Sequence, residues 1–429
     1  MPFTGTTFSY TSPTSATGAV AGQVIQSASW DQIHTDIQNA FTSMYTSIEG
    51  STSVINAGVV SLASSAASQT SLTNIITSVQ SQFTNINSMR NFIANGGFEV
   101  WQRCSGSFTP GTSTFSVAAS TLQYTADRWY IQTGANQAST VVSAVGLSNP
   151  SNLCCQVQRN SGQTGVGAYV FAYPLDTPDI VRMHGLKVNF SMLAATGTNW
   201  SPTSGTFTVT LYLGTGVVGK RNATPYTNET QAFSISTNLA AGSGATTISG
   251  TSSAIIPTTT TQAELQIAWT PTGTASTNDY IQFDDVMLET INYTGTWTAT
   301  AFDRTPFDVE LYLCKRHYQK TFGYGTSPAA ASGSLAGAIP ALQAVVTQQL
   351  LGFWILPVIM RTTPTLTTYN PTQSGSNWES FSLGVDNTSV AVITRTSNIT
   401  STAIHIFTTT SGGTVASIQY IHAAADAGI

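Results

Sequence analysis

The stretch Asn91-Phe-Ile-Ala-Asn-Gly-Gly-Phe-Glu-Val-Trp-Gln-Arg103 decides the fold, because the apolar pattern of the chain changes on its two sides. Before it, apolar residues recur at helical spacing, and after it they alternate as in strands. Asn95-Gly96-Gly97 marks the change, since glycine tolerates positive φ and ends helices. The pattern predicts a mainly β protein with an N-terminal α-helical coiled-coil stalk, a β-sandwich or jelly roll, and a smaller C-terminal β-domain.

The composition is poor in charge. Only 8% of the 429 residues are charged, against roughly 25% in an ordinary soluble domain. A hydrophobic content of 41% and an aromatic content of 10% can build packed cores, which argues against disorder. The net charge of −5 and the absence of a basic cluster exclude nucleic acid as a partner. No apolar run approaches the roughly 18 residues of a membrane span, so no membrane insertion is expected.

Residues 29–92 are predicted to form the stalk. Ser29 can cap a first helix that ends at Glu49-Gly50-Ser51, residues 51–70 are compatible with a loop, a short strand or a loose helix, and a second helix starts at about Ser71. Both helices carry a narrow apolar stripe at the spacing of a coiled-coil seam. The seam residues are Trp30, Ile33, Ile37, Phe41, Met44 and Ile48, then Leu72, Ile76, Val79, Phe83 and Ile86.

Helices this short, with faces rich in Ser and Thr, are marginal in isolation, so their stripes need a partner surface. β-branched Ile and Val at several seam positions favour three strands over two. We therefore expect a homotrimer joined through residues 29–92. The alternative is that both helices pack on the β-domain of their own chain.

Residues 91–295 are predicted to form one β-domain, because short alternating runs are separated by Gly, Ser, Asn and Pro turns. The runs are Tyr124–Gln132, Thr140–Val145, Leu153–Arg159, Ala168–Ala172, Leu186–Leu193, Thr206–Leu213, Gln262–Trp269 and Tyr280–Leu288. A helical connector over 296–322 contains a helix at Phe307–Tyr318. Residues 323–429 are expected to form the distal C-terminal β-domain, with strands at Ser389–Thr396, Ala403–Thr409 and Val415–His422.

Several motifs resemble those of bacteriophage tail-fibre and related virion fibre proteins. They are Asn91–Arg103, Thr125-Ala-Asp-Arg-Trp129, Phe283-Asp-Asp-Val-Met-Leu-Glu289, the segment Thr300–Gln319 and the segment Phe353–Pro364. In that family such motifs open and close a jelly-roll domain similar to carbohydrate-binding modules. The main resemblance covers residues 91–322.

The resemblance implies a bacteriophage tail or neck fibre, a structural and host-attachment protein that binds cell-surface glycans through trimeric β-domains. The alternative is a purely structural head or neck fibre, or a decoration protein, without receptor binding. Its partners would be host surface polysaccharide and another virion protein, such as a portal, adaptor or tail protein, bound by an anchoring peptide at residues 1–28. The alternative for residues 1–28 is that they fold back on the trimer formed by their own chain. The N-terminus lacks a signal peptide, so we expect folding in the host cytoplasm and display on the virion.

The resemblance also implies a structural Ca²⁺ between the first and last strands of the jelly roll, and no other cofactor is expected. Glu99 matches the Gly-Phe-Glu motif, and Asp284 or Asp285 matches the Asp-Asp-Val motif. Carboxylate oxygens suit this hard cation. Alternation places Asp284 and Asp285 on opposite faces, so one of them is the ligand. The alternative is that these carboxylates hydrogen-bond to turn amides.

Glycan contact needs exposed aromatic rings beside polar groups. Trp200, Tyr226, Tyr369 and Trp378 stand in polar, turn-like surroundings and are the candidates, although a lone aromatic residue in a loop more often serves packing.

The sequence contains no nucleophile elbow and no separate acid pair for glycoside cleavage. We therefore predict no catalytic residues and no enzyme activity. Cys104, Cys154, Cys155 and Cys314 lack metal or redox spacing and are predicted to be buried thiols.

Overall fold

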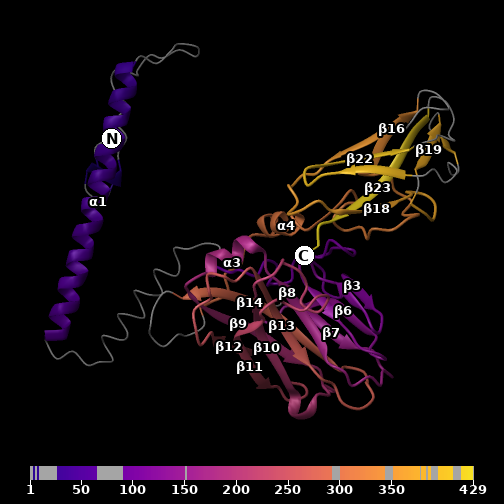
Figure 1. Ribbon diagram of the computed structural model, residues 1–429, viewed down its shortest axis with the longest axis horizontal. Helices are drawn as coiled ribbons and strands as arrows, with labels where there is room; N and C mark the ends of the chain where they lie inside the picture. Colours follow the sequence, from indigo (N-terminus) through magenta and orange to yellow (C-terminus); the bar gives the residue numbers. More distant parts are fainter. Residues whose placement is uncertain are drawn as a thin grey trace. The chain divides into compact units, whose positions relative to one another are not determined.

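The structure is a computed structural model that describes most of the chain (Figure 1). The described residues are 3–4, 7–8, 27–64, 90–149, 152–291, 300–343, 351–376, 378–382, 385–387, 395–408 and 417–428. They fall into two compact units, Met1–Asn87 and Ser88–Ile429.

The first unit contains one long helix. Strands β1 (Phe3–Thr4) and β2 (Thr7–Phe8) pair antiparallel, and α1 runs from Ser27 to Ser64. The predicted helix end at Gly50 is wrong, because α1 continues for 14 residues beyond Gly50, where a glycine in a helix costs only about 1 kcal/mol. No helix in the described part of the chain is long and apolar enough to cross a membrane.

The predicted seam of the first helix lies on α1, and its described side chains are exposed. Ile37 is 38% exposed, Phe41 63%, Met44 45% and Ile48 55%. The second predicted helix, with Leu72, Ile76, Val79, Phe83 and Ile86, lies outside the described residues, as does most of the predicted anchoring peptide. These exposures describe the first unit by itself, so the alternative that the stripe packs on the β-domain of the same chain stays a prediction.

The second unit begins with a sandwich of two six-stranded sheets, in which every neighbouring pair is antiparallel. One sheet has the order β11 (Thr230–Asn238), β10 (Thr206–Gly214), β13 (Gln262–Trp269), β8 (Tyr169–Pro174), β5 (Tyr130–Gln132) and β4 (Leu122–Tyr124). The other has β12 (Thr246–Thr251), β9 (Lys187–Thr196), β14 (Tyr280–Ile291), β7 (Leu153–Arg159), β6 (Ser139–Val145) and β3 (Thr114–Val117). A mainly β fold is thus confirmed.

The sandwich core is built from alternating side chains of both sheets, as the sequence pattern predicts. Trp129 stacks on Phe171 with ring centroids 5.0 Å apart, and Phe171 stacks on Phe283 of the opposite sheet at 5.4 Å. The four cysteines are buried, which confirms that prediction for Cys104, Cys154, Cys155 and Cys314.

The predicted run Tyr124–Gln132 is two strands joined by a turn. The amide of Thr125 donates to the carbonyl of Trp129, and Arg128 adopts a φ of 74°. The chain reverses there, so β4 and β5 form a hairpin with Leu122 opposite Gln132.

The C-terminal part follows a short helix, α4 (Phe307–Lys315). Tyr318 lies beyond the helix in β15 (Tyr318–Lys320), so the predicted helix is too long at its end. The long strand β23 (Ser417–Asp426) pairs with four strands: β15, β16 (Ile339–Gln343), β18 (Thr365–Tyr369) and β19 (Glu379–Ser382). Strand β20 (Val385–Asn387) pairs with β19. Strands β17 (Leu351–Ile355), β22 (Ala403–Thr408) and β21 (Arg395–Ile399) form a three-stranded sheet.

Candidate functional site

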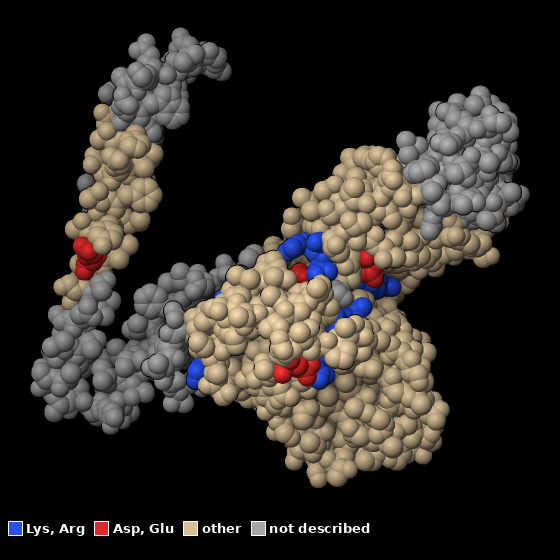
Figure 2. Space-filling view, in the orientation of Figure 1, with Lys and Arg blue, Asp and Glu red and all other residues tan. Residues whose placement is uncertain are grey.

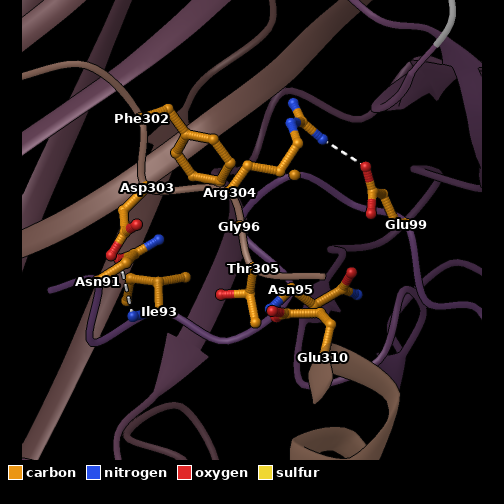
Figure 3. Close-up of a pocket in the computed structure, with 11 residues that line it drawn as sticks. Asn91, Ile93, Asn95, Gly96, Glu99, Phe302, Asp303, Arg304, Thr305 and Glu310 are labelled. Atoms are coloured by element: carbon orange, nitrogen blue, oxygen red, sulfur yellow. Dashed lines mark hydrogen bonds and ion pairs between the residues drawn. The ribbon is translucent and has the colours of Figure 1, made fainter. Parts of the chain in front are cut away.

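Two of the three residues predicted to bind calcium, Glu99 and Asp285, lie at the side chain of Arg304. Figure 3 shows Arg304 with Glu99. Its guanidinium pairs with Glu99, and its Nη2 lies 2.7 Å from Asp285 Oδ1. Asp284 is fully buried and accepts hydrogen bonds from the amides of Leu147 at 2.7 Å and Ser148 at 3.3 Å. Burial and the neighbouring Asp285 raise the pKa of Asp284 to about 7.

This arrangement does not fit a calcium ion. A guanidinium already supplies the positive charge between Glu99 and Asp285, and Asp284 is engaged with turn amides, which was the alternative left open by the sequence. Within the described residues, no group of three or more His, Cys, Asp or Glu side chains is placed to hold a metal ion.

The cavity beside Arg304 has a volume of only about 10 Å³, room for a single water molecule. The residues that line the cavity join the start of the domain to strand β14. Asn91 Nδ2 donates to the Val286 carbonyl at 2.9 Å, and a Cβ at Gly96 would lie 2.1 Å from the same carbonyl oxygen. Glu310 of α4 accepts from the Asn95 amide, and burial raises the pKa of Glu310 to about 7. The Asn91–Arg103 motif therefore acts as a structural junction.

The aromatic residues predicted to contact glycans are mostly buried, so that prediction is wrong for three of the four. Trp200 is 7% exposed and lies 5.9 Å from Trp269, Tyr226 is 7% exposed, and Trp378 is 2% exposed. Trp378 packs against Gly352, and the Tyr226 hydroxyl donates to the Gly219 carbonyl at 2.9 Å. Burial therefore leaves these three rings no open face for a sugar. Tyr369 is half-buried and meets Phe322 edge-on at 5.5 Å.

Charged side chains gather where the sandwich meets the C-terminal sheets (Figure 2). Asp176 lies at the centre of one cluster: its carboxylate contacts Arg128 at 3.3 Å, His317 at 2.9 Å and Arg361 at 3.0 Å. Burial and the nearby Arg128 lower the pKa of His317 to about 4, whereas His317 and the two guanidinium groups hold the pKa of Asp176 well below its usual range. A second pair joins Arg103 to Asp426. These contacts fasten the sandwich to the C-terminal sheets.

An open groove of about 500 Å³ lies beside the β4–β5 hairpin. It is lined by Ser120, Thr121, Leu122, Gln132, Thr133, Gly134, Asn222 and Ala223. The volume is in the range of small-ligand sites, roughly 300–1,000 Å³. The sequence did not predict this site, because a hairpin and a turn far along the chain form it together and neither carries a motif.

The segment over residues 215–229 forms one wall of the groove and covers part of the outer face of its sheet. Arg221 donates its amide to Glu264 at 3.0 Å, and Gln266 Nε2 donates to Asn222 Oδ1 at 3.1 Å. Tyr130 donates its hydroxyl to Glu264 at 2.7 Å, and burial raises the pKa of Glu264. The buried polar side chains on this face of β13 are therefore paired beneath the covering segment.

Comparison with known proteins gives a likeness of fold only. No protein-family model matches the sequence, and no curated protein matches it. Similar solved structures include the enzymatically active domain of tailspike protein 4 of Bacteriophage CBA120, at 15% identity over 47% of this chain and 22% of that chain, with a TM-score of 0.27. A Stig cyclase from Fischerella sp. TAU is 14% identical over 48% of this chain and 98% of that chain, with a TM-score of 0.31.

A third similar structure is TmCBM61, described in complex with β-1,4-galactotriose, at 11% identity over 47% of this chain and 99% of that chain, with a TM-score of 0.22. The chain spans less than a quarter of the tailspike chain that it matches. At these identities and TM-scores, the likeness assigns neither a ligand nor a reaction to this protein.

The prediction that the protein is not an enzyme is corrected by these structures, because cyclases and an enzymatically active tailspike domain are among the similar chains. That prediction rested on missing sequence motifs. A missing motif does not exclude activity, since a given fold hosts many functions.

Proposed function

We propose that this protein is a fibre of a bacteriophage particle, in which copies of the chain associate through α1 and the β-domain attaches to a glycan of the host surface. The motifs around Asn91–Arg103 and Thr300–Gln319 support this proposal, as does the sandwich fold of two antiparallel sheets. In this proposal the N-terminal residues anchor the fibre to another virion protein.

The observation that carries the proposal is the exposed stripe of α1. At about 1.5 Å per residue the 38 residues of α1 span about 57 Å, and Phe41, Met44 and Ile48 stay about half exposed along it. The helix contains three acidic residues and no Lys or Arg, so association of copies through α1 would depend on apolar contacts and not on salt bridges between the copies. A second and third copy of the same stripe would cover these side chains at seam spacing.

Attachment to glycans would benefit from this assembly. Neutral, hydroxyl-rich surfaces bind sugars weakly through hydrogen bonds, and linking three copies raises the avidity by roughly 10²-fold or more. The low charge of the chain fits such a surface, because only 8% of its residues are charged.

The test is binding of the full-length protein to an array of bacterial surface polysaccharides, together with its mass in solution. The proposal expects a trimer that binds at least one polysaccharide, and a seam variant, Phe41→Ser, that binds roughly 10²-fold more weakly because it remains a single chain. A trimer without binding would favour a purely structural fibre. A monomeric wild-type protein would overturn the proposed assembly.

A further inference from the structure

We propose that the groove between the β4–β5 hairpin and the Asn222–Ala223 turn binds an uncharged oligosaccharide, and that the sugar chain continues from the groove across the outer face of the sheet. This inference rests on the proposed role in glycan attachment. It adds the place of binding and the chemical class of the glycan.

The lining of the groove carries hydrogen-bonding groups without charge. Ser120 and Thr121 contribute hydroxyls, and Gln132 and Asn222 contribute amides, whereas none of the eight lining residues is ionisable. Such groups can donate to and accept from sugar hydroxyls. Leu122, directly opposite Gln132 across the hairpin, supplies an apolar surface for the C–H face of a sugar ring.

Asn222 has an unmet hydrogen-bonding capacity at the groove wall. Its Oδ1 accepts from Gln266, whereas its Nδ2 is enclosed and has no acceptor in the described part of the chain. Enclosed polar groups without partners are uncommon and costly. The amide can donate to an oxygen of a bound sugar if the Asn222 side chain turns toward the groove on binding.

Both walls of the groove are held in place by their own contacts. On the hairpin side, the Ser120 amide donates to the Gly134 carbonyl at 2.8 Å, and the Thr133 hydroxyl donates to the Ala118 carbonyl at 2.8 Å. On the other side, Arg221 pairs through two nitrogens with Glu229, at 2.7 Å and 2.8 Å. A preformed site loses less conformational entropy on binding.

The groove continues into a row of side chains that crosses the whole sheet in register. The row consists of Leu122, Gln132, Val170, Ala268, Thr208 and Ser236. All six face away from the core, none is buried and none is charged, and six strands at about 4.8 Å spacing extend about 24 Å. The neighbouring row, which includes Tyr130 and Gln266, is covered by residues 215–229. The open row therefore offers an uncharged track that starts at the groove.

The test uses the full-length protein and calorimetric titration with cellohexaose, maltohexaose, mannohexaose and 1,4-linked galactohexaose, with hexagalacturonate as the acidic comparison. We expect at least one neutral hexaose to bind, with an affinity that changes less than about twofold between low and high salt, because no ion pair is formed. Gln132→Trp, which fills the groove, and Asn222→Ala should each weaken binding about tenfold or more. The matched control Ser116→Trp, on exposed β3 of the other sheet, should leave the affinity unchanged.

Amide hydrogen exchange of the wild-type protein gives a readout that does not depend on any variant. A bound hexaose should slow exchange within residues 118–134 and 220–224. Failure of all neutral hexaoses to bind, or equal binding by Gln132→Trp and wild type, would overturn the site. Binding at the groove by a monomeric protein would leave this site standing and overturn only the proposed assembly, whereas a trimer that binds hexagalacturonate alone would overturn the site and not the assembly.

Discussion

The β-sandwich and helix α1 differ in where their apolar side chains go. In the sandwich, Trp129, Phe171 and Phe283 stack inside their own chain and are fully buried. On α1, Ile37, Phe41 and Ile48 follow an equally regular pattern but stay exposed. The comparison teaches that a periodic apolar pattern specifies a secondary structure, whereas the surface that covers it can lie outside the chain. The following changes test this difference, from the largest expected effect to the smallest.

Replacing Phe41 by Ser removes one apolar side chain from each copy of the proposed seam. Burial of a Phe side chain contributes about 2 kcal/mol, so three copies lose about 6 kcal/mol of association free energy. Analytical ultracentrifugation should show dissociation at concentrations at which the wild type stays assembled. Thr42→Ser, one position away on the exposed face of α1, is the control and should remain assembled. An unchanged assembly of Phe41→Ser would show that the stripe has no role in association.

Replacing Trp129 by Ala should destabilise the sandwich and leave association intact. The ring stacks on Phe171, and its Nε1 donates to the Asn95 carbonyl at 3.1 Å, so its removal creates a cavity and costs about 3–5 kcal/mol. Denaturant unfolding of the β-domain measures the loss. Phe41→Ser should leave this transition unchanged, and a shift of similar size in both variants would contradict the separation of the two regions.

His317 should make the unfolding free energy depend on pH, because it lies in the contact between the sandwich and the C-terminal sheets. The pKa of His317 is about 4 in the folded chain and 6.5 in the unfolded chain. Below pH 6.5 the unfolded state therefore binds a proton that the folded state does not bind. Stability should therefore fall between pH 6.5 and 4, by up to about 3 kcal/mol. His317→Gln should lose this part of the pH dependence, and unfolding free energies across that range measure it.

Three buried carboxyl groups act in the opposite direction. Burial raises the pKa of Asp127 to about 6 and the pKa values of Asp284 and Glu310 to about 7, so each group stabilises the fold more as the pH falls. The difference between wild type and His317→Gln is therefore the quantity to compare. His34→Gln, at an exposed position of α1, is the control, and an identical pH profile for His317→Gln and wild type would refute the role of His317.

Replacing Arg304 by Gln should have the smallest effect. Arg304 pairs with Glu99 and Asp285 but is 29% exposed, so solvent screening limits the loss to about 1 kcal/mol. Thermal melts measure the loss, and the same melts with and without EDTA test whether calcium contributes. Arg182→Gln is the control, since it breaks one exposed pair with Asp179 and one contact with the Phe92 ring, and it should cost less than Arg304→Gln. A large EDTA effect on the wild type would contradict the arrangement around Arg304.

Local alternation was sufficient to predict several strands. The bounds of β7 (Leu153–Arg159) and β13 (Gln262–Trp269) agree with the predicted runs. Strands β11 and β12 were missed, because they lie in a region rich in Ser and Thr that reads as a long connection. Helix α1 passes through Gly50, since one glycine does not stop a long helix.

The candidate site depended on contacts that no local pattern reveals. Trp200 and Trp378 stand among polar sequence neighbours, yet Trp200 is buried beside Trp269, nearly 70 residues away. The carboxylates of Glu99 and Asp285 were predicted to meet, and they do so through Arg304, whose position the predicted strands did not specify. The groove beside Gln132 needs Asn222 from a separate segment. Such proximity is a property of the tertiary fold.

The mass of the full-length protein in solution tests the central claim most directly. Size-exclusion chromatography with light scattering, at micromolar concentration, should give a mass of three 45.1 kDa chains, because the exposed side chains of α1 would then be covered by other copies. A single mass of 45.1 kDa, with Ile37 and Phe41 exposed and the helix still folded, would contradict the account.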